Sequence, residues 1–169
     1  MSGRVGGAGS KSGVIGNSGV QVASLRQENS AGSNIAQNTT GSYLVLDLNT
    51  SYDPSNLILG ISSQRFKISP GRYSISGYVE VIGAAGDAAS ALYDYTNSSY
   101  IVYGQVAYSS GSGTGGGYWS SHIPVIWSGN INVTTEIELR ARFSEACYTA
   151  GGPNFGHVNV AHQINVIKF

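Results

Sequence analysis

The chain has 169 residues, of which 9 are acidic and 9 basic, so its formal net charge at pH 7 is zero. Charged residues make up 11% of the sequence, less than half of the usual share of about 25%. A nucleic-acid-binding protein or an electrostatic membrane binder should carry a basic surface, and this composition argues against both classes. Because little charge repulsion separates copies of such a chain, the composition favours self-association.

Cys147 is the single cysteine, so the fold cannot depend on an internal disulfide. No base accompanies it in the sequence, which argues against a catalytic thiol. The opening residues 1–7 contain no apolar run, and no stretch of the chain approaches about eighteen apolar residues. We therefore expect no secretion signal, no membrane span and synthesis in a cytosol.

Residues 1–41 differ in composition from the rest of the chain, because glycine and serine dominate and large apolar side chains are few. Such a segment cannot build a core, so we predict an extended arm that a neighbouring subunit or a partner surface holds in place. Val20, Val22 and Leu25 are expected to contribute apolar contacts between the arm and that neighbouring surface. The Gly-Ser-Lys-Ser sequence at 9–12 lacks the spacing of a phosphate-binding loop. The residues expected to anchor the arm are Arg4, Val5, Lys11, Val14 and Ile15.

From residue 42 onward, short apolar runs alternate with Gly, Ser, Asn and Pro turns, which predicts a single all-β domain over 42–169. The expected strands cover 43–48, 57–60, 64–68, 72–82, 90–95, 100–108, 118–127, 131–143 and 158–169. Turns are expected at 52–55, 96–99 and 128–130, with loops at 83–87, 109–117 and 149–156. No window has a helical period, so the predicted fold is an antiparallel two-sheet jelly-roll sandwich with an extended N-terminal arm.

The longest alternating run is 131–143, which predicts one long strand with a buried and a solvent-facing side. The side chains expected to point inward are Ile131, Val133, Thr135, Ile137, Leu139, Ala141 and Phe143. The opposite side collects four charges in a chain that has few, namely Glu136, Glu138, Arg140 and Arg142. We interpret these charges as an ion-pair ladder that pairs across strands or across a subunit boundary.

Four parts of the sequence, taken in order, carry a family resemblance. They are Phe66-Lys-Ile-Ser-Pro-Gly-Arg-Tyr-Ser-Ile75, then Ala91-Leu-Tyr-Asp-Tyr-Thr-Asn97 with Val102-Tyr-Gly104, then Ile137-Glu-Leu-Arg-Ala-Arg-Phe143, and finally Gln163-Ile-Asn-Val-Ile-Lys-Phe169. Together they resemble the tumour-necrosis-factor/complement-head-like jelly rolls, in the version found in virion proteins of tailed bacteriophages. The opening at 9–16 looks like the N-termini of marine phage structural proteins. The resemblance implies a tight trimer and no family-wide catalytic residues.

The 11 tyrosines are more than a small core needs, and tyrosine favours interfaces because it offers a large contact area with a polar tip. Many of them fall in the middle strands, where some should pack within the sandwich and others line a subunit seam. The candidates for the trimer interface are Tyr93, Tyr95, Tyr103, Glu136, Glu138, Arg140 and Arg142.

Catalytic and metal sites find little support. His157 and His162 are five residues apart and would face opposite sides of a strand, and His122 lies far away in the sequence. Asp53 and Asp87 are isolated, which argues against a calcium site. A pair of glutamates could hydrolyse glycans, but those on the long strand share their face with two arginines. We expect no catalytic residues, no metal and no cofactor.

These observations favour a homotrimeric structural protein of a bacteriophage virion, assembled in the host cytoplasm and not an enzyme. The first expectation is a capsid decoration or cement protein whose arm binds the major capsid protein or another virion protein. The alternative is the tip of a tail fibre or head fibre, whose loops at 83–88, 109–117 and 149–156 would bind a host cell-surface glycan. An enzyme on the same scaffold is a more distant third possibility. No nucleic-acid or membrane partner is expected.

Overall fold

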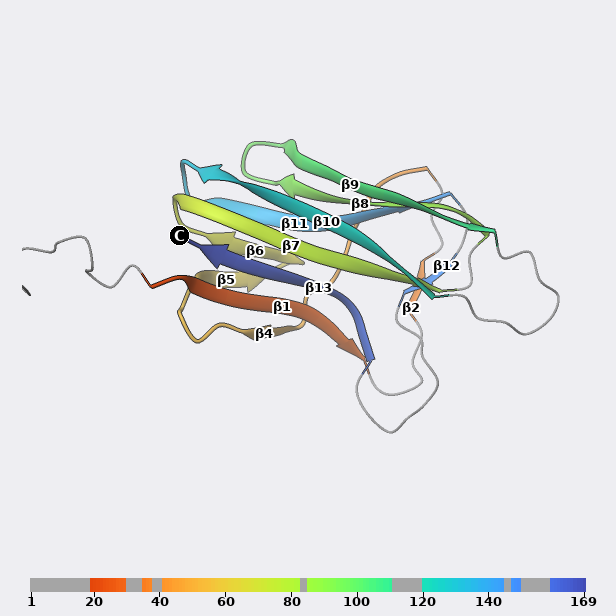
Figure 1. Cartoon of the computed structure of the whole chain (residues 1–169), viewed down its shortest axis with the longest axis horizontal. Coiled ribbons are helices and arrows are strands. Elements are labelled where there is room, and N and C mark those ends of the chain that lie inside the picture. Colours follow the sequence, from red (N-terminus) through yellow and green to blue (C-terminus); the bar gives the residue numbers. More distant parts are fainter. Residues whose placement is uncertain are drawn as a thin grey trace, which may run out of the picture.

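The computed structural model describes residues 19–29, 35–37, 41–82, 85–110, 120–144, 147–149 and 159–169. In these ranges the chain forms strands and turns, and the strands pair into two antiparallel sheets (Figure 1). No helix in the same ranges is long and apolar enough to cross a bilayer. The predicted all-β, two-sheet sandwich is confirmed.

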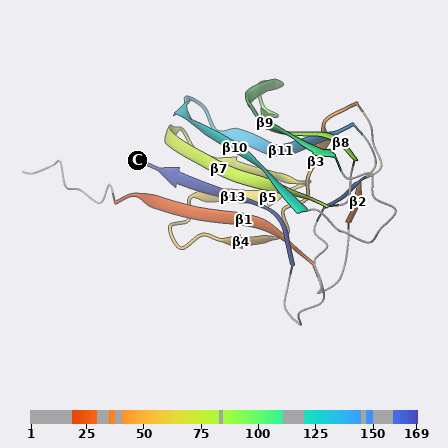
Figure 2. The same cartoon turned by 45° about the vertical axis from the view of Figure 1, so that its right-hand side comes forward.

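Sheet I consists of strands whose pairing order is β2, β12, β7, β13, β1 and β4, with β10 also paired to β7. Figures 1 and 2 both show β10, β7, β13 and β1 side by side in one layer. The bounds are β1 Gln21–Asn29, β2 Ile35–Gln37, β4 Thr50–Tyr52, β7 Gly71–Ile82, β10 Ser120–Ile131, β12 Cys147–Thr149 and β13 Asn159–Lys168.

Sheet II has the pairing order β5, β6, β11, β8 and β9, with the short β3 also paired to β11. The bounds are β3 Leu44–Val45, β5 Ile58–Ser62, β6 Arg65–Ile68, β8 Ala85–Asp94, β9 Ser99–Ser110 and β11 Thr135–Phe143. The turn predicted at 96–99 lies one residue earlier, at 95–98, because Ser99 already pairs with Asp94 as the first residue of β9. β8 begins earlier than predicted, because Asp87 pairs with Tyr108 of β9 and therefore belongs to the strand instead of a loop.

The core lies between the two sheets and follows the predicted period of two along β11. Thr135, Ile137, Leu139, Ala141 and Phe143 are all buried there. From sheet I they meet the inward side chains of β7, β10, β13 and β1, which include Ile75, Val79, Ile123, Val125, Ile164 and Leu25. The inward prediction is wrong for Val133, which is 51% exposed because it lies in the turn that precedes β11.

The turn predicted at 128–130 is placed four residues too early. β10 stays paired with β7 up to Ile131, which lies opposite Gly71, and the chain turns at 132–134. The sequence analysis assigned Gly129 to a turn, but this glycine lies within β10, in close contact with the side chain of Trp127. A Cβ atom at this position would lie 2.5 Å from Cζ2 of Trp127. The glycine is needed so that the indole can lie against the strand.

The predicted boundary of the arm at residue 41 is also wrong. Residues 21–29 form β1, which lies between β13 and β4 in sheet I. Leu25 is fully buried opposite Ile164, so it belongs to the core and does not grip a partner, whereas Val20 and Val22 are exposed. The sandwich therefore starts near residue 20. The predicted anchors Arg4, Val5, Lys11, Val14 and Ile15 lie outside the described residues.

The segment between β1 and β5 departs from the predicted strand at 43–48. Only Leu44–Val45 pair as β3, while Leu46 and Leu48 are buried without a strand. Tyr52, predicted in a turn, ends β4 instead. Asp53 then holds the turn, because its carboxylate accepts hydrogen bonds from the backbone N–H groups of Leu57 at 2.8 Å and Ile58 at 2.7 Å.

Candidate functional site

The outer face of sheet II carries a connected group of charged side chains. Along β11 the outward positions are the four predicted charges Glu136, Glu138, Arg140 and Arg142. The strands on either side add further groups in register, since Glu136 lies opposite Lys67 and Glu138 lies opposite both Arg65 and Tyr93. The predicted interface candidates on β8, β9 and β11 therefore share the outer face of sheet II, and Tyr95 lies in the turn after β8.

Glu138 is the centre of this face. One carboxylate oxygen accepts a hydrogen bond from Arg65 Nε and the other from Arg140 Nε, both at 2.7 Å. The hydrogen bond to Glu138 raises the pKa of Arg65. Although Glu138 lies on the predicted solvent-facing side, only 1% of its side chain is exposed. The interpretation as an ion-pair ladder is confirmed for Glu136 and Lys67, at 3.0 Å, and for Glu138 with both arginines.

Tyrosine rings cover the ion pairs. The guanidinium carbon of Arg140 lies 3.3 Å from the ring centroid of Tyr93, and that of Arg65 lies 3.2 Å from the ring centroid of Tyr95. Such contacts are attractive because the ring face is negative. The rings of four tyrosines form a continuous group, which we name the tyrosine cluster: Tyr43, Tyr93, Tyr100 and Tyr103.

The tyrosine cluster acts as a second, smaller layer outside the sandwich. Tyr100 stacks on Tyr103 with centroids 4.5 Å apart, and Tyr43 lies 5.4 Å from Tyr100. Ala91, an outward residue of β8 opposite Arg140, is fully buried, which requires that neighbouring side chains cover it. Tyr93 and Arg140 are therefore engaged within the chain, whereas Tyr95 and Tyr103 keep large exposed surfaces.

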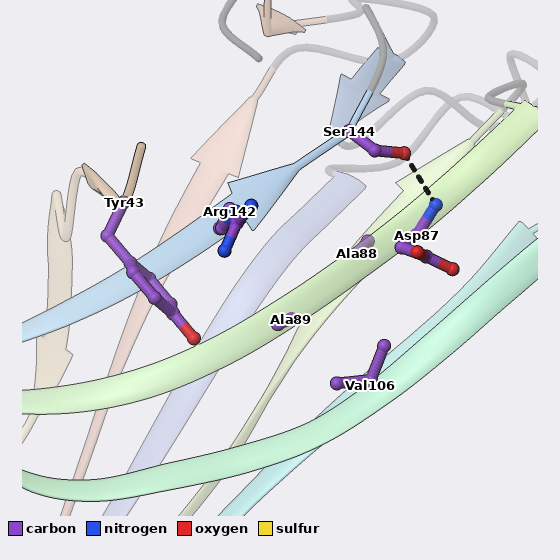
Figure 3. Close-up of a pocket in the computed structure, with 7 residues that line it drawn as sticks. All are labelled: Tyr43, Asp87, Ala88, Ala89, Val106, Arg142 and Ser144. Carbon is purple, nitrogen blue, oxygen red and sulfur yellow. Dashed lines mark hydrogen bonds between the residues drawn. The ribbon is translucent and has the colours of Figure 1, made fainter. Parts of the chain in front are cut away.

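Beyond the tyrosine cluster the same face is hollowed. Arg142 of β11 lies opposite Ala89 of β8, which lies opposite Val106 of β9, so the middle of this row has only a methyl group. A trough of about 240 Å³ results. Figure 3 shows Tyr43 and Arg142 on one side, Val106 on the other and Ala89 between them. The trough is lined by Tyr43, Asp87, Ala88, Ala89, Val106, Arg142 and Ser144.

Polar groups hold one end of the trough in place. The backbone N–H of Asp87 donates to Ser144 Oγ at 2.7 Å (Figure 3). The backbone N–H of Ser144 donates to the Asp87 carbonyl at 2.8 Å. At the other end, burial raises the pKa of Tyr43, with smaller contributions from Tyr100 and Tyr103, so its hydroxyl stays protonated and able to donate. Sequence reasoning singled out Arg142 here but missed Tyr43, Ala89 and Val106.

Comparisons with known proteins define the fold. No family model matches the chain, and no curated protein matches it. Among solved structures, murine APRIL aligns with a TM-score of 0.60 and 7% identity, over 89% of this chain and 100% of that chain. Eiger TNF from S. frugiperda aligns with a TM-score of 0.61 and 8% identity, over 89% of this chain and 92% of that chain. The chain folds as a tumour-necrosis-factor-like jelly roll. At such low identity the likeness shows the fold alone.

The opposite outer face of this TNF-like jelly roll, on sheet I, has two neighbouring uncharged rows beside the Arg26–Glu28 ion pair. The strand registers align one uncharged row across five strands, made of Tyr52, Ser24, Asn165, Ser76 and Ile126. A second uncharged row consists of Val22, Ile167, Ser74 and Ser128. Tyr52 is 70% exposed and Ile126 is 68% exposed. These rows form what we name the neutral face.

The histidines of the TNF-like jelly roll lie apart from the trough. His162 is buried between the sheets, where its Nε2 contacts the Asp47 carbonyl, and burial lowers its pKa to about 4. His122 is exposed beside Tyr78, with ring centroids 4.6 Å apart. His157 lies outside the described residues. Within the described ranges, no group of three or more His, Cys, Asp or Glu residues could hold a metal ion.

Proposed function

We propose that the protein is a structural component of a bacteriophage virion, a decoration protein that assembles as a homotrimer through the neutral face. The observation that carries the assembly is the pair of uncharged rows, in which exposed Tyr52 and Ile126 flank small polar side chains. Proteins with a TNF-like fold typically form homotrimers. The proposal assigns no catalytic activity to the chain.

The neutral face fits an interface better than the charged face does. Interface cores are depleted of charged residues and enriched in aromatic ones, because a buried charge must lose its hydration. On sheet II the charged groups already pair within the chain, as Glu138 does with Arg65 and Arg140. The seam proposed here therefore differs from the one that the sequence indicated, which included Tyr93, Tyr95, Tyr103 and the charges of β11.

The position of β1 suggests how the trimer would attach to a shell. Gln21, the first residue of β1, pairs with Lys168 at the end of β13, so the segment before β1 joins the sandwich at the end where the chain terminates (Figure 1). In the proposal this segment, with Arg4, Val5, Lys11, Val14 and Ile15, binds the major capsid protein or another virion protein.

A second candidate function is the tip of a tail fibre or head fibre that binds a host glycan. The trough beside Arg142 favours it, because the trough lies on sheet II and stays accessible when copies assemble through sheet I. Both candidates place the protein in the virion.

The assembly is tested by measuring the mass of the purified chain at micromolar concentration by light scattering. We expect a trimer, which Ile126→Asp dissociates by placing a charge in the seam. The matched control is Val106→Asp, since Val106 is 66% exposed on the other sheet and Ile126 is 68% exposed. A monomeric wild-type chain, or equal dissociation by both variants, would refute the assembly.

The virion role is tested separately with empty capsids. Deletion of residues 2–18 leaves β1 intact, so the trimer should remain while binding to the shell is lost. If the deleted trimer decorates shells as the wild-type protein does, the anchoring role of the segment is wrong.

A further inference from the structure

Arg142 differs from the other described cations on the outer face of sheet II. Arg65 and Arg140 share the buried carboxylate of Glu138, and Lys67 pairs with Glu136. Among the residues that the structure describes, no carboxylate forms an ion pair with Arg142, which is exposed at the trough. A guanidinium group offers a planar fork of donors that fits a carboxylate with two parallel hydrogen bonds.

The walls of the trough restrict what an anion there could be. Its apolar lining residues are Ala88, Ala89 and Val106, and they suit an apolar C–H surface. Its polar groups are the hydroxyl of Tyr43, the hydroxyl of Ser144 and the carboxylate of Asp87. Because Ser144 Oγ already accepts a hydrogen bond from the backbone of Asp87, its own hydrogen is left to donate to a ligand.

Charge and size exclude larger or more highly charged ligands. The guanidinium of Arg142, which has no ion-pair partner among the described residues, balances a single negative charge, and the nearby Asp87 carboxylate would repel a phosphate dianion. The same carboxylate can accept hydrogen bonds from ligand hydroxyl groups. Drug-sized ligands occupy pockets of about 300 Å³ or more. The trough, at about 240 Å³, suits a smaller unit.

We propose that the trough binds one monosaccharide unit that carries a carboxylate, such as the acidic end of a glycan. The carboxylate binds Arg142, the C–H face of the sugar lies on Ala89 and Val106, and the sugar hydroxyls bind Asp87 and Ser144. This site does not depend on the assembly proposed above, because it lies on the other sheet.

The test is a titration of the isotope-labelled full chain, followed by NMR, with glucuronic acid and N-acetylneuraminic acid as probes and glucose as the neutral reference. We expect at least one acidic sugar to bind at millimolar concentration and to shift the amide signals of 87–89 and 142–144. Glucose should bind more weakly. Arg142→Gln should weaken acidic-sugar binding at least about tenfold, the usual effect of losing a charge-assisted hydrogen bond.

Two further variants make the result specific. Lys67→Gln removes a cation from the same face but outside the trough, and it should leave the affinity within about twofold. Ala89→Leu fills the trough while keeping Arg142, and it should abolish binding. The proposal is overturned if neither acidic sugar binds, if glucose binds equally well, or if Arg142→Gln binds as the wild-type chain does. Ile126→Asp alters only the neutral face, so this variant should still bind the acidic sugar even if it is a monomer. The trimer proposal and the sugar-binding proposal can therefore be refuted independently of each other.

Discussion

Glu138 and Arg140 lie two residues apart on β11 and form an ion pair on its outer side, with Arg140 Nε 2.7 Å from a carboxylate oxygen of Glu138. A period of two places such residues on the same face, so the sequence alone indicates this contact. Arg65 of β6 completes the group, although it lies 73 residues before Glu138 in the sequence. The carboxylate is buried because guanidinium groups and tyrosine rings cover it.

Replacing Glu138 should destabilise the fold more than replacing its neighbour Glu136. Glu138→Gln leaves two guanidinium groups without their shared partner, and we expect the free energy of unfolding to fall by about 2 kcal/mol. Glu136→Gln disturbs a partly exposed pair and should cost at most about 1 kcal/mol. Urea unfolding of both variants measures the difference. Equal losses would mean that the buried carboxylate contributes no more than a surface one.

His162 should make stability depend on pH. Burial lowers the pKa of His162 to about 4 from 6.5. Between these values the unfolded chain binds a proton that the folded chain does not, so stability is full above about pH 6.5 and falls towards pH 4. The decrease should approach about 1.4 kcal/mol per pH unit and about 3 kcal/mol in total.

The measurement for His162 is urea unfolding at a series of pH values between 7 and 4. His162→Gln should remove the component of the slope that is due to this residue, whatever its effect on absolute stability. His122→Gln, at an exposed position, should keep the wild-type slope. If the two variants and the wild-type chain show the same pH dependence, the burial of a neutral His162 is wrong.

Leu25 tests whether β1 belongs to the folded body. It is fully buried opposite Ile164, so Leu25→Ala should remove about 3 kcal/mol from the free energy of unfolding. Val20→Ala, at an exposed position just before β1 and outside the neutral face, should change it by less than about 0.5 kcal/mol. Chemical unfolding monitored by tyrosine and tryptophan fluorescence distinguishes them. A small effect of Leu25→Ala would restore the boundary near residue 42.

Gly77 should not tolerate a side chain. A Cβ atom there would lie 2.4 Å from the backbone carbonyl oxygen of Gln163 on β13, and a backbone cannot move aside as a flexible side chain can. We expect Gly77→Ala to cost about 2 kcal/mol. Gly60, where a Cβ atom would meet nothing within 4 Å, is the matched control. Thermal unfolding of the two variants is the measurement, and equal midpoints would contradict the close approach of β7 and β13.

The pattern of the chain predicted the fold class because a period of two and regular turn residues are local properties. β11, the inward set from Thr135 to Phe143 and the turn between β8 and β9 follow from them. β1 escaped prediction because its apolar inward residues, Ala23 and Leu25, are few and lie next to a glycine-rich segment. The turn at 128–130 was misplaced because a glycine can serve packing as well as a turn, as Gly129 does beside Trp127.

The sequence by itself determined which side chains of β11 face outward, since alternation needs only the strand. Only the tertiary structure decided what they meet there. Arg65 joins Glu138, and Ala89 separates Arg142 from Val106, because strands distant in the chain align in one register. The same alignment joins Tyr52 and Ile126 into one uncharged row. Alternation is encoded within each strand, whereas register depends on the packing of all strands at once.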